Sequence, residues 1–332
     1  MISASVLPKT VLEISPQGAN TPNKEGFPFA YAVVARLCER SSMSGYLLRI
    51  VLCLLCVGLL SILAPSVRGQ SDTSASLNPA RLAIVGGTVA VGVTAIHLYQ
   101  QDAWWKEYRT SFHFREDLEY AKNIDKLGHL YAASAMTFIF SKSLQWCNMN
   151  EPSSLLWGAV SSTLFQTYVE IEDGYSAYWG FDRVDYAANL FGAWYPVLQH
   201  HVPIFKNFQF RFSYFPKNEG SAGAIPGQTK TVFDDYEGQT FWLTITPKGL
   251  FSEKSLGWWP DWLAIAGGVS VRDNNSPDRY LVWFLAPDLD MTKIIPQNTP
   301  FLRTLGEALN FIHFPMPAVQ VSPGVVWYGL YF

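Results

Sequence analysis

The sequence predicts an α+β fold, in which a hydrophobic bundle of about four helices is followed by an antiparallel β-sheet half of about six strands. Apolar stretches long enough for helices fill the chain between Leu82 and His200, and after Pro203 apolar residues instead alternate with polar ones. Hydrophobic residues make up 49% of the chain and charged residues 15%, below the roughly one quarter that soluble domains carry. This composition favours a protein that meets a membrane.

The charge balance narrows the choice of partners. The net charge is −3 at pH 7 and no lysine- or arginine-rich run occurs, which excludes nucleic acid, because that partner requires a basic surface. The 12 Trp and 16 Tyr suit a bilayer interface, although a large soluble core would enrich aromatic residues too. We therefore expect membrane lipid as a partner.

The first part of the chain has the layout of an export signal. Residues 1–42 are polar and aperiodic, and we expect a non-native or disordered extension there, with translation starting at Met43. Residues 43–69 place a charged residue before the apolar run 50–64 and small residues after it, as a signal peptide does. A retained anchor helix is the alternative. Residues 70–80 are predicted to be a linker, because they are rich in Ser, Asp and Asn.

Cysteines offer no convincing attachment point for lipid. Cys53 and Cys56 lie inside the apolar run, but leucines occupy the positions before them, where lipoprotein processing requires a small residue. After removal of the signal segment only Cys147 would remain, so that the mature chain could form no internal disulfide.

Residues 81–202 are predicted to form a helical, membrane-associated domain. Its first helix, Leu82–Leu98, is slightly shorter than the ~20 residues that usually span a bilayer. Later apolar stretches are each interrupted by Lys, Gln, Glu or Asp, which indicates helices of a bundle rather than helices surrounded by lipid. These three stretches are 125–146, 153–170 and 183–200.

Residues 203–332 are predicted to be the antiparallel β region. Strands are expected at 208–214, 241–246, 263–271, 280–288, 318–321 and 325–332, with a helix at Phe301–Phe311. The last strand is aromatic and alternates up to Phe332, which resembles the closing strand of outer-membrane barrels. An ordinary sheet packed on the helices is the competing interpretation, since the smallest such barrels use about eight strands.

Polar residues interrupt the apolar helices in three places. Asp125, Lys126 and His129 open the first, Glu170 and Asp173 close the second, and Asp182, Asp185 and Asn189 begin the third. The spacing of Asp182, Asp185, Asn189 and Gly192 follows one helical face, with Gly192 clearing room. Buried charges are costly unless they meet partners, so we expect these groups to converge, with Lys126, His129 and Arg183 as the cations.

Three interpretations of this cluster remain open. General acid–base catalysis would draw on Asp125, Lys126, His129, Glu170, Asp173, Asp185 and Asn189. A divalent cation would be held by a set chosen from His129, Glu170, Asp173, Asp182 and Asp185. The third interpretation is an inert network that fastens the helices together. No motif for a nucleotide or other organic cofactor occurs.

Two sequence blocks resemble a known family. DKLGH (125–129) and EIEDGYSAYWGFDRVDYAANLFGA (170–193) resemble the YfiM-like family, domain of unknown function 2279. DDYEGQTFWLT (234–244) and PAVQ (317–320) extend the resemblance, which covers roughly Trp104 to Phe332. The same polar skeleton is similar to that of VanZ-like membrane proteins. The resemblance implies a predicted periplasmic or membrane lipoprotein without an established activity.

Carried over residue by residue, the resemblance matches the candidate cluster. The matching positions are Asp125, Lys126, His129, Glu170, Asp173, Gly174, Asp185, Asn189 and Gly192. Asp182 stands where relatives usually have Ser. We therefore expect a cell-envelope, membrane-associated protein of uncharacterised activity, with inner and outer membrane both open. The alternative is a membrane-embedded enzyme or binder that acts on a lipid-linked or phosphate-bearing envelope substrate.

Overall fold

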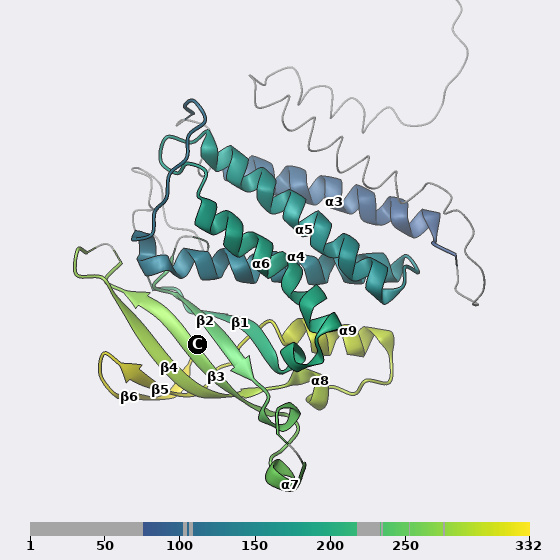
Figure 1. Cartoon of the computed structure of the whole chain (residues 1–332), viewed down its shortest axis with the longest axis vertical. Coiled ribbons are helices and arrows are strands. Elements are labelled where there is room, and N and C mark those ends of the chain that lie inside the picture. The colour runs from purple at the N-terminus through teal and green to yellow at the C-terminus, as the bar shows by residue number, and fades with distance from the viewer. Residues whose placement is uncertain are drawn as a thin grey trace, which may run out of the picture. The chain divides into compact units, whose positions relative to one another are not determined.

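The computed structural model describes residues 76–101, 105, 109–217, 233, 235–251, 253–274 and 276–332 (Figure 1). All of them lie in one of the two compact units of the chain, Val51–Phe332. The expected extension at 1–42 and the signal peptide at 43–69 lie outside the described residues, as does most of the expected linker.

Four long helices come first in the described chain, as the sequence predicts. They are α3 (Pro79–Gln100), α4 (Ile124–Trp146), α5 (Glu151–Gly174) and α6 (Arg183–His201), with 3-10 turns η2 (Tyr120–Asn123) and η3 (Pro203–Asn207) beside them. An Asn side chain caps the start of α3 and of α5, where it accepts a hydrogen bond from a backbone N–H of the first turn, and a proline follows each cap.

Small residues let α4, α5 and α6 pack closely. The Ser162 hydroxyl of α5 donates a hydrogen bond to the Ala133 carbonyl of α4 over 2.8 Å. The Thr137 hydroxyl of α4 donates to the Ala193 carbonyl of α6, also over 2.8 Å. A side chain at Gly192 would collide with the α4 backbone. This close packing brings the polar faces of the three helices together.

Helix α3 is the one described helix long and apolar enough to cross a membrane, over Pro79–Leu98. Only 17% of its most apolar window is buried within the described structure. It contacts the bundle near its start, where Leu82 packs with Leu144 of α4, and further along, where Val93 belongs to a cluster with Phe165 and Tyr168 of α5. A membrane span here stays a prediction.

The β half forms one six-stranded antiparallel sheet with the strands in chain order. The strands are β1 (Phe208–Tyr214), β2 (Gln239–Ile245), β3 (Leu263–Arg272), β4 (Tyr280–Leu289), β5 (Met316–Ser322) and β6 (Val326–Tyr331). Between them lie η4 (Pro247–Gly249), α7 (Glu253–Leu256), α8 (Met291–Ile294) and α9 (Pro300–Leu309). The predicted α+β fold class is confirmed.

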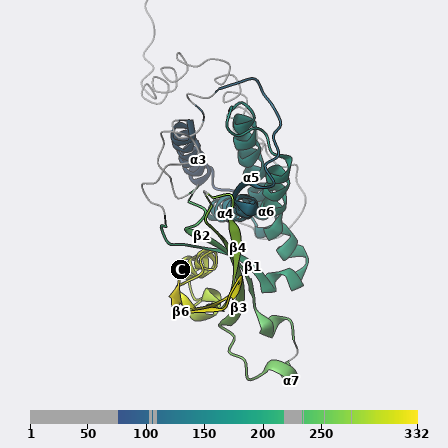
Figure 2. The same cartoon turned by 90° about the vertical axis from the view of Figure 1, so that its left-hand side faces the viewer.

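The sheet curls strongly, as Figure 2 shows. The Tyr331 hydroxyl of β6 lies 3.1 Å from the Thr240 hydroxyl of β2 and accepts a hydrogen bond of 2.9 Å from Arg272 of β3. Since β2 and β6 are far apart in the strand order, only a curled sheet brings them together. Its inner face holds Trp242 and Phe284, and the outer face turns away from this core.

Helix α4 joins the bundle to the outer face of the sheet at one end. Its Tyr131 ring lies 5.4 Å from the ring of Phe212 and 6.2 Å from that of Phe241. The same apolar cluster contains Ile124 and Val269. The start of α4, which carries Asp125, Lys126 and His129, therefore packs against the sheet.

Candidate functional site

Lys126, in the first turn of α4, is surrounded by carboxyl groups. Its Nζ lies 2.5 Å from Asp117 Oδ1, 2.9 Å from Asp125 Oδ2, 3.1 Å from Asp182 Oδ2 and 3.1 Å from Asp185 Oδ1. Burial alone would lower the pKa of Lys126, but Asp125 and its other carboxylate neighbours raise it. The ammonium group therefore stays charged, and it offsets only part of the negative charge around it.

Asp182 connects α6 to the loop before α4. Its Oδ1 caps α6 by accepting hydrogen bonds from the N–H of Val184 and of Asp185, while Oδ2 accepts one from the N–H of Asp117. Burial would raise the pKa of Asp182, but these backbone donors together with Lys126 lower it. Asp182 is thus an ionised cap.

The backbone just before α4 adopts an uncommon conformation. Ala121, Lys122 and Asn123 have φ values of 45°, 54° and 67°, in the left-handed region that residues other than glycine seldom occupy. The turn leads directly into the helix that carries Asp125 and Lys126. A strained backbone conformation persists only where the surrounding packing imposes it. The strained turn at residues 121–123 lies next to the candidate cluster.

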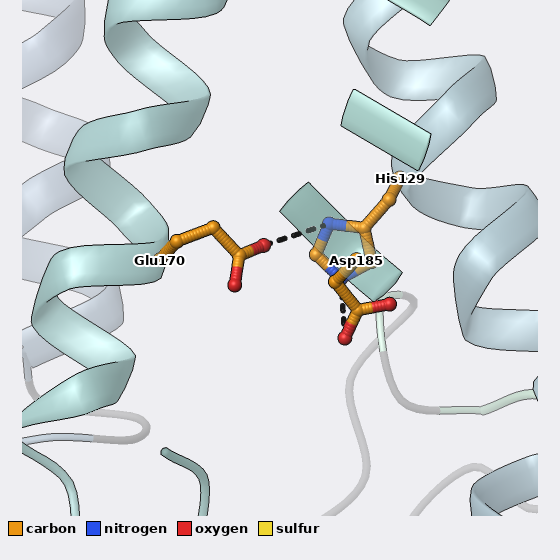
Figure 3. A group of neighbouring side chains, drawn as sticks. All are labelled: His129, Glu170 and Asp185. Carbon is orange, nitrogen blue, oxygen red and sulfur yellow. Dashed lines mark ion pairs between the residues drawn. The ribbon is translucent and has the colours of Figure 1, made fainter. Parts of the chain in front are cut away.

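His129 lies one turn along α4 from Asp125, between Glu170 of α5 and Asp185 of α6 (Figure 3). Its Nδ1 is 3.5 Å from Glu170 Oε1, and its Nε2 is 3.7 Å from Asp185 Oδ2. Asn189 links the group, because its Oδ1 lies 3.2 Å from His129 Nδ1 and its Nδ2 donates to Glu170 Oε1 over 2.8 Å. The His129 side chain is 26% exposed, so solvent reaches this side of the cluster.

The carboxyl groups around His129 and Lys126 hold protons more tightly than usual. Burial raises the pKa of Glu170 to about 9 and that of Asp125 and Asp185 to about 7, and it also raises the pKa of Asp173, which lies outside this group of contacts, to about 7. Repulsion between neighbouring carboxylates adds to each shift. Burial also lowers the pKa of His129. The cluster therefore holds more negative groups than its cations balance, and it favours either extra protons or an extra cation.

Most of the predicted site residues meet in space. Asp125, Lys126, His129, Glu170, Asp182, Asp185 and Asn189 are joined by the contacts above. Asp173 is engaged elsewhere, because its Oδ1 accepts a 2.7 Å hydrogen bond from the Trp105 indole. Arg183, expected as a cation for the cluster, instead pairs with Glu116 on the surface.

Asp117 is the site residue that the sequence pattern missed. It lies in the loop before α4, where no helical period draws attention to it, yet it makes the shortest contact with Lys126. Arg109 was missed as well, and it pairs with Glu172 over 2.7 Å beside the main cluster. The one signal in the sequence is Lys126 itself. A lysine expected among several carboxylates could have prompted a search for a further acidic residue such as Asp117.

Two groups of side chains in the described residues have the geometry of cation ligands. In the first, ligand atoms of His129, Glu170 and Asp185 lie within 4.8 Å of one another. In the second, those of Asp117, Asp182 and Asp185 do so, but Lys126 is already bonded to all three. A cation is therefore better accommodated by the first group, which lacks a lysine at its centre.

A cavity found in the described structure lies elsewhere. It has a volume of about 240 Å³ and lies between the start of α5 and the end of α6, lined by Pro152, Ser153, Leu155, Leu156, Val197, His200 and His201. The cluster occupies the opposite ends of these two helices. This cavity therefore offers no room for a substrate beside His129.

Comparison with known proteins gives one match. Residues 113–201 match the model of a family described as "Predicted periplasmic lipoprotein (DUF2279)". No curated protein and no solved structure matches the chain. The assignment to YfiM-like proteins, the similarity to VanZ-like proteins and the resemblance outside residues 113–201 stay predictions. The matched segment contains α4, α5 and α6 together with every residue of the candidate cluster.

Proposed function

We propose that this chain is a membrane-associated cell-envelope protein whose helical bundle binds a divalent cation between His129, Glu170 and Asp185. The observation that carries the proposal is the convergence of ligand atoms from these three residues within 4.8 Å. The envelope location is supported by the description of the matching family as periplasmic. It also agrees with the expected export signal.

The charge balance supports a cation rather than a solely structural network. Asp125, Asp182 and Asp185 share Lys126, and Glu170 lies nearby without a permanently charged partner of its own. Oδ1 of the buried Asp125 has no hydrogen-bond partner within the described structure. A bound divalent cation would offset this excess and allow the carboxyl groups to ionise.

The ligand types narrow the choice of ion. One imidazole nitrogen with two carboxylate oxygens suits first-row transition metals and zinc better than calcium, which prefers a shell composed of oxygen. Three protein ligands leave coordination positions for water or substrate, and the His129 side chain is partly exposed.

An acid–base site acting on a phosphate-bearing envelope substrate is the second candidate. It is favoured by the pKa of Asp185, which is raised to about 7, next to a histidine whose pKa is lowered. It has the weaker support, because the cavity between α5 and α6 lies at the far end from these residues.

Calorimetric titration of the purified full chain with Mn²⁺, Zn²⁺, Mg²⁺ and Ca²⁺ tests the proposal. We expect Mn²⁺ or Zn²⁺ to bind, and Glu170→Gln and Asp185→Asn each to weaken binding by at least the roughly 10–100-fold that loss of a hydrogen-bond partner of a metal ligand costs. His200→Ala is the matched control, because His200 lies at the other end of α6 and should leave binding unchanged. Absence of binding by the wild type, or binding by both site variants as tight as that of the wild type, would contradict the proposal.

A further inference from the structure

The outer face of the curled sheet is apolar from one edge to the other. The strand registers place Phe210, Leu243, Gly267, Leu285, Val319 and Trp327 in one row of directly paired positions. Directly paired residues project on the same side of a sheet. Within this row Leu243, Leu285 and Trp327 are 40%, 52% and 79% exposed, so much of it is uncovered in the described structure.

The adjacent row repeats the pattern. Phe208, Ile245, Ile265 and Pro287 are paired in succession across β1 to β4. Ile265 is 44% exposed. Trp283 projects on the same face two residues before Leu285 in β4, and it is 48% exposed. Two adjoining rows of apolar side chains form a surface rather than isolated exposed residues.

The charged residues of the strands all lie on the inner face. The six strands contain Arg211, Arg272 and Asp288 as their only charged residues. Arg211 pairs in register with the buried Trp242, and Asp288 with the buried Ala264. A sheet with one face in water normally places its polar residues on the exposed side. This sheet does the reverse, as sheets that face lipid do.

The apolar surface continues onto α6. The Phe191 ring of α6 lies 6.4 Å from the ring of Phe210, at the β1 edge of the sheet. Phe191 is 50% exposed, and Trp194, one turn further on, is 39% exposed. We call the exposed outer sheet rows together with these two α6 residues the sheet–α6 surface.

Exposed aromatic residues border this surface at the end of the strands. Phe251, Trp258 and Trp262, between β2 and β3, are 60%, 75% and 45% exposed. The side-chain amide of Asn207, just after α6, donates a hydrogen bond to the Gly249 carbonyl, which places this segment beside the end of α6. Tryptophan is enriched where a membrane-bound surface meets the headgroups.

We infer that the sheet–α6 surface contacts the acyl chains of a phospholipid bilayer. A protein partner would need polar groups to pair with, at about one hydrogen bond per 100–200 Å² of interface. Apart from the indole N–H of Trp327, the two rows offer no polar side-chain group for such bonds, whereas acyl chains need none. The inference rests on the proposed membrane association and is independent of the cation site.

Photo-crosslinking of the full chain in its native membranes tests the inference. The photoreactive residue p-benzoylphenylalanine replaces Leu285 or Ile265 on the surface, and Phe301 on α9 as the matched control, since Phe301 is 73% exposed but outside the surface. Val91 of α3, which is 71% exposed, is the second control, because it tests whether α3 alone contacts lipid. After irradiation, mass spectrometry identifies what is attached at each position.

We expect phospholipid adducts at positions 285 and 265 and no phospholipid adduct at position 301. A second copy of the chain or another protein attached at 285 and 265 would overturn the inference, as would phospholipid attached at position 91 alone. Divalent-cation titration of the same variants separates the two proposals. Retained cation binding with no lipid adduct would reject the lipid surface alone, whereas lipid adducts without cation binding would reject the cation site alone.

Discussion

At the scale of single residues, Lys126 controls the electrostatics of the bundle. Its ammonium group contacts the carboxyl groups of Asp117, Asp125, Asp182 and Asp185 within 3.1 Å. Its side chain is only 9% exposed, so water contributes little screening. Removing one partner from a buried charge network leaves the others uncompensated, which costs much more than the network contributes when intact.

We expect Lys126→Met to lower the free energy of unfolding by about 3–5 kcal/mol, because the buried carboxylates lose their shared cation. Chemical denaturation followed by circular dichroism measures the change. Lys206→Met is the control, since Lys206 is exposed and should alter stability by about 0.5 kcal/mol or less. Similar stability of the two variants would show that Lys126 does not hold the cluster together.

At the scale of elements, close helix packing depends on glycine. Gly192 lies against the backbone of α4, where a Cβ would meet the Leu130 carbonyl, whereas a Cβ at Gly87 of α3 would meet nothing within 4 Å. The same α6 helix carries Asp185 and Asn189 into the cluster. Any outward shift of α6 therefore moves two site residues away from His129.

Gly192→Ala should destabilise the protein by about 1–3 kcal/mol, because overpacking forces α6 away from α4. Gly87→Ala should leave stability unchanged or raise it by about 0.5–1 kcal/mol, since alanine favours helix and the space is open. Thermal unfolding of both variants makes the comparison. Equal effects would mean that the α4–α6 contact is looser than the structure indicates.

At the scale of the whole molecule, the sequence predicted the architecture better than the network of contacts. Strand β1 was predicted at Phe208–Tyr214 and occurs there, because alternation of apolar and polar residues indicates a strand. Alternation did not indicate which side is buried, since the fully buried residues of β1 are Arg211 and Ser213. The convergence of Asp185 and Asn189 followed from helical spacing. Contacts set by tertiary packing gave no such signal. Asp117 lies in an aperiodic loop, and Trp105 reaches Asp173 from a distant part of the chain.

The β half contains a buried cluster of three polar side chains that the sequence patterns did not indicate. Arg211 of β1 lies 3.1 Å from Asp288 of β4, and His313 lies 3.2 Å from the same carboxyl group while stacking on Trp242. Only the curl of the sheet brings these strands and the segment after α9 together. Neither the strand periods nor the short-range spacing of these residues encodes that curl.

The raised carboxyl pKa values predict how the stability of the whole chain depends on pH. Glu170 titrates near 4.5 when unfolded but at about 9 when folded, so the folded state binds more protons between these values. Without divalent cations, the unfolding free energy should therefore fall as the pH rises from about 5 to 9. Glu170→Gln, which cannot ionise, should flatten this fall, and thermal unfolding at a series of pH values with a chelator present measures it. An unchanged pH profile would show that Glu170 ionises normally.

Asn189 has a consequence for the chemistry of the histidine beside it. Because its amide nitrogen donates to Glu170, its oxygen can only accept, and His129 must carry its hydrogen on Nδ1. That tautomer leaves the lone pair of Nε2 directed toward Asp185, available to a metal ion. Replacing Asn189 with leucine should therefore release the ring to exchange between its two neutral tautomers. Nitrogen-15 chemical shifts of the imidazole, which differ between protonated and unprotonated ring nitrogens, would report a single tautomer in the wild type and a mixture in Asn189→Leu.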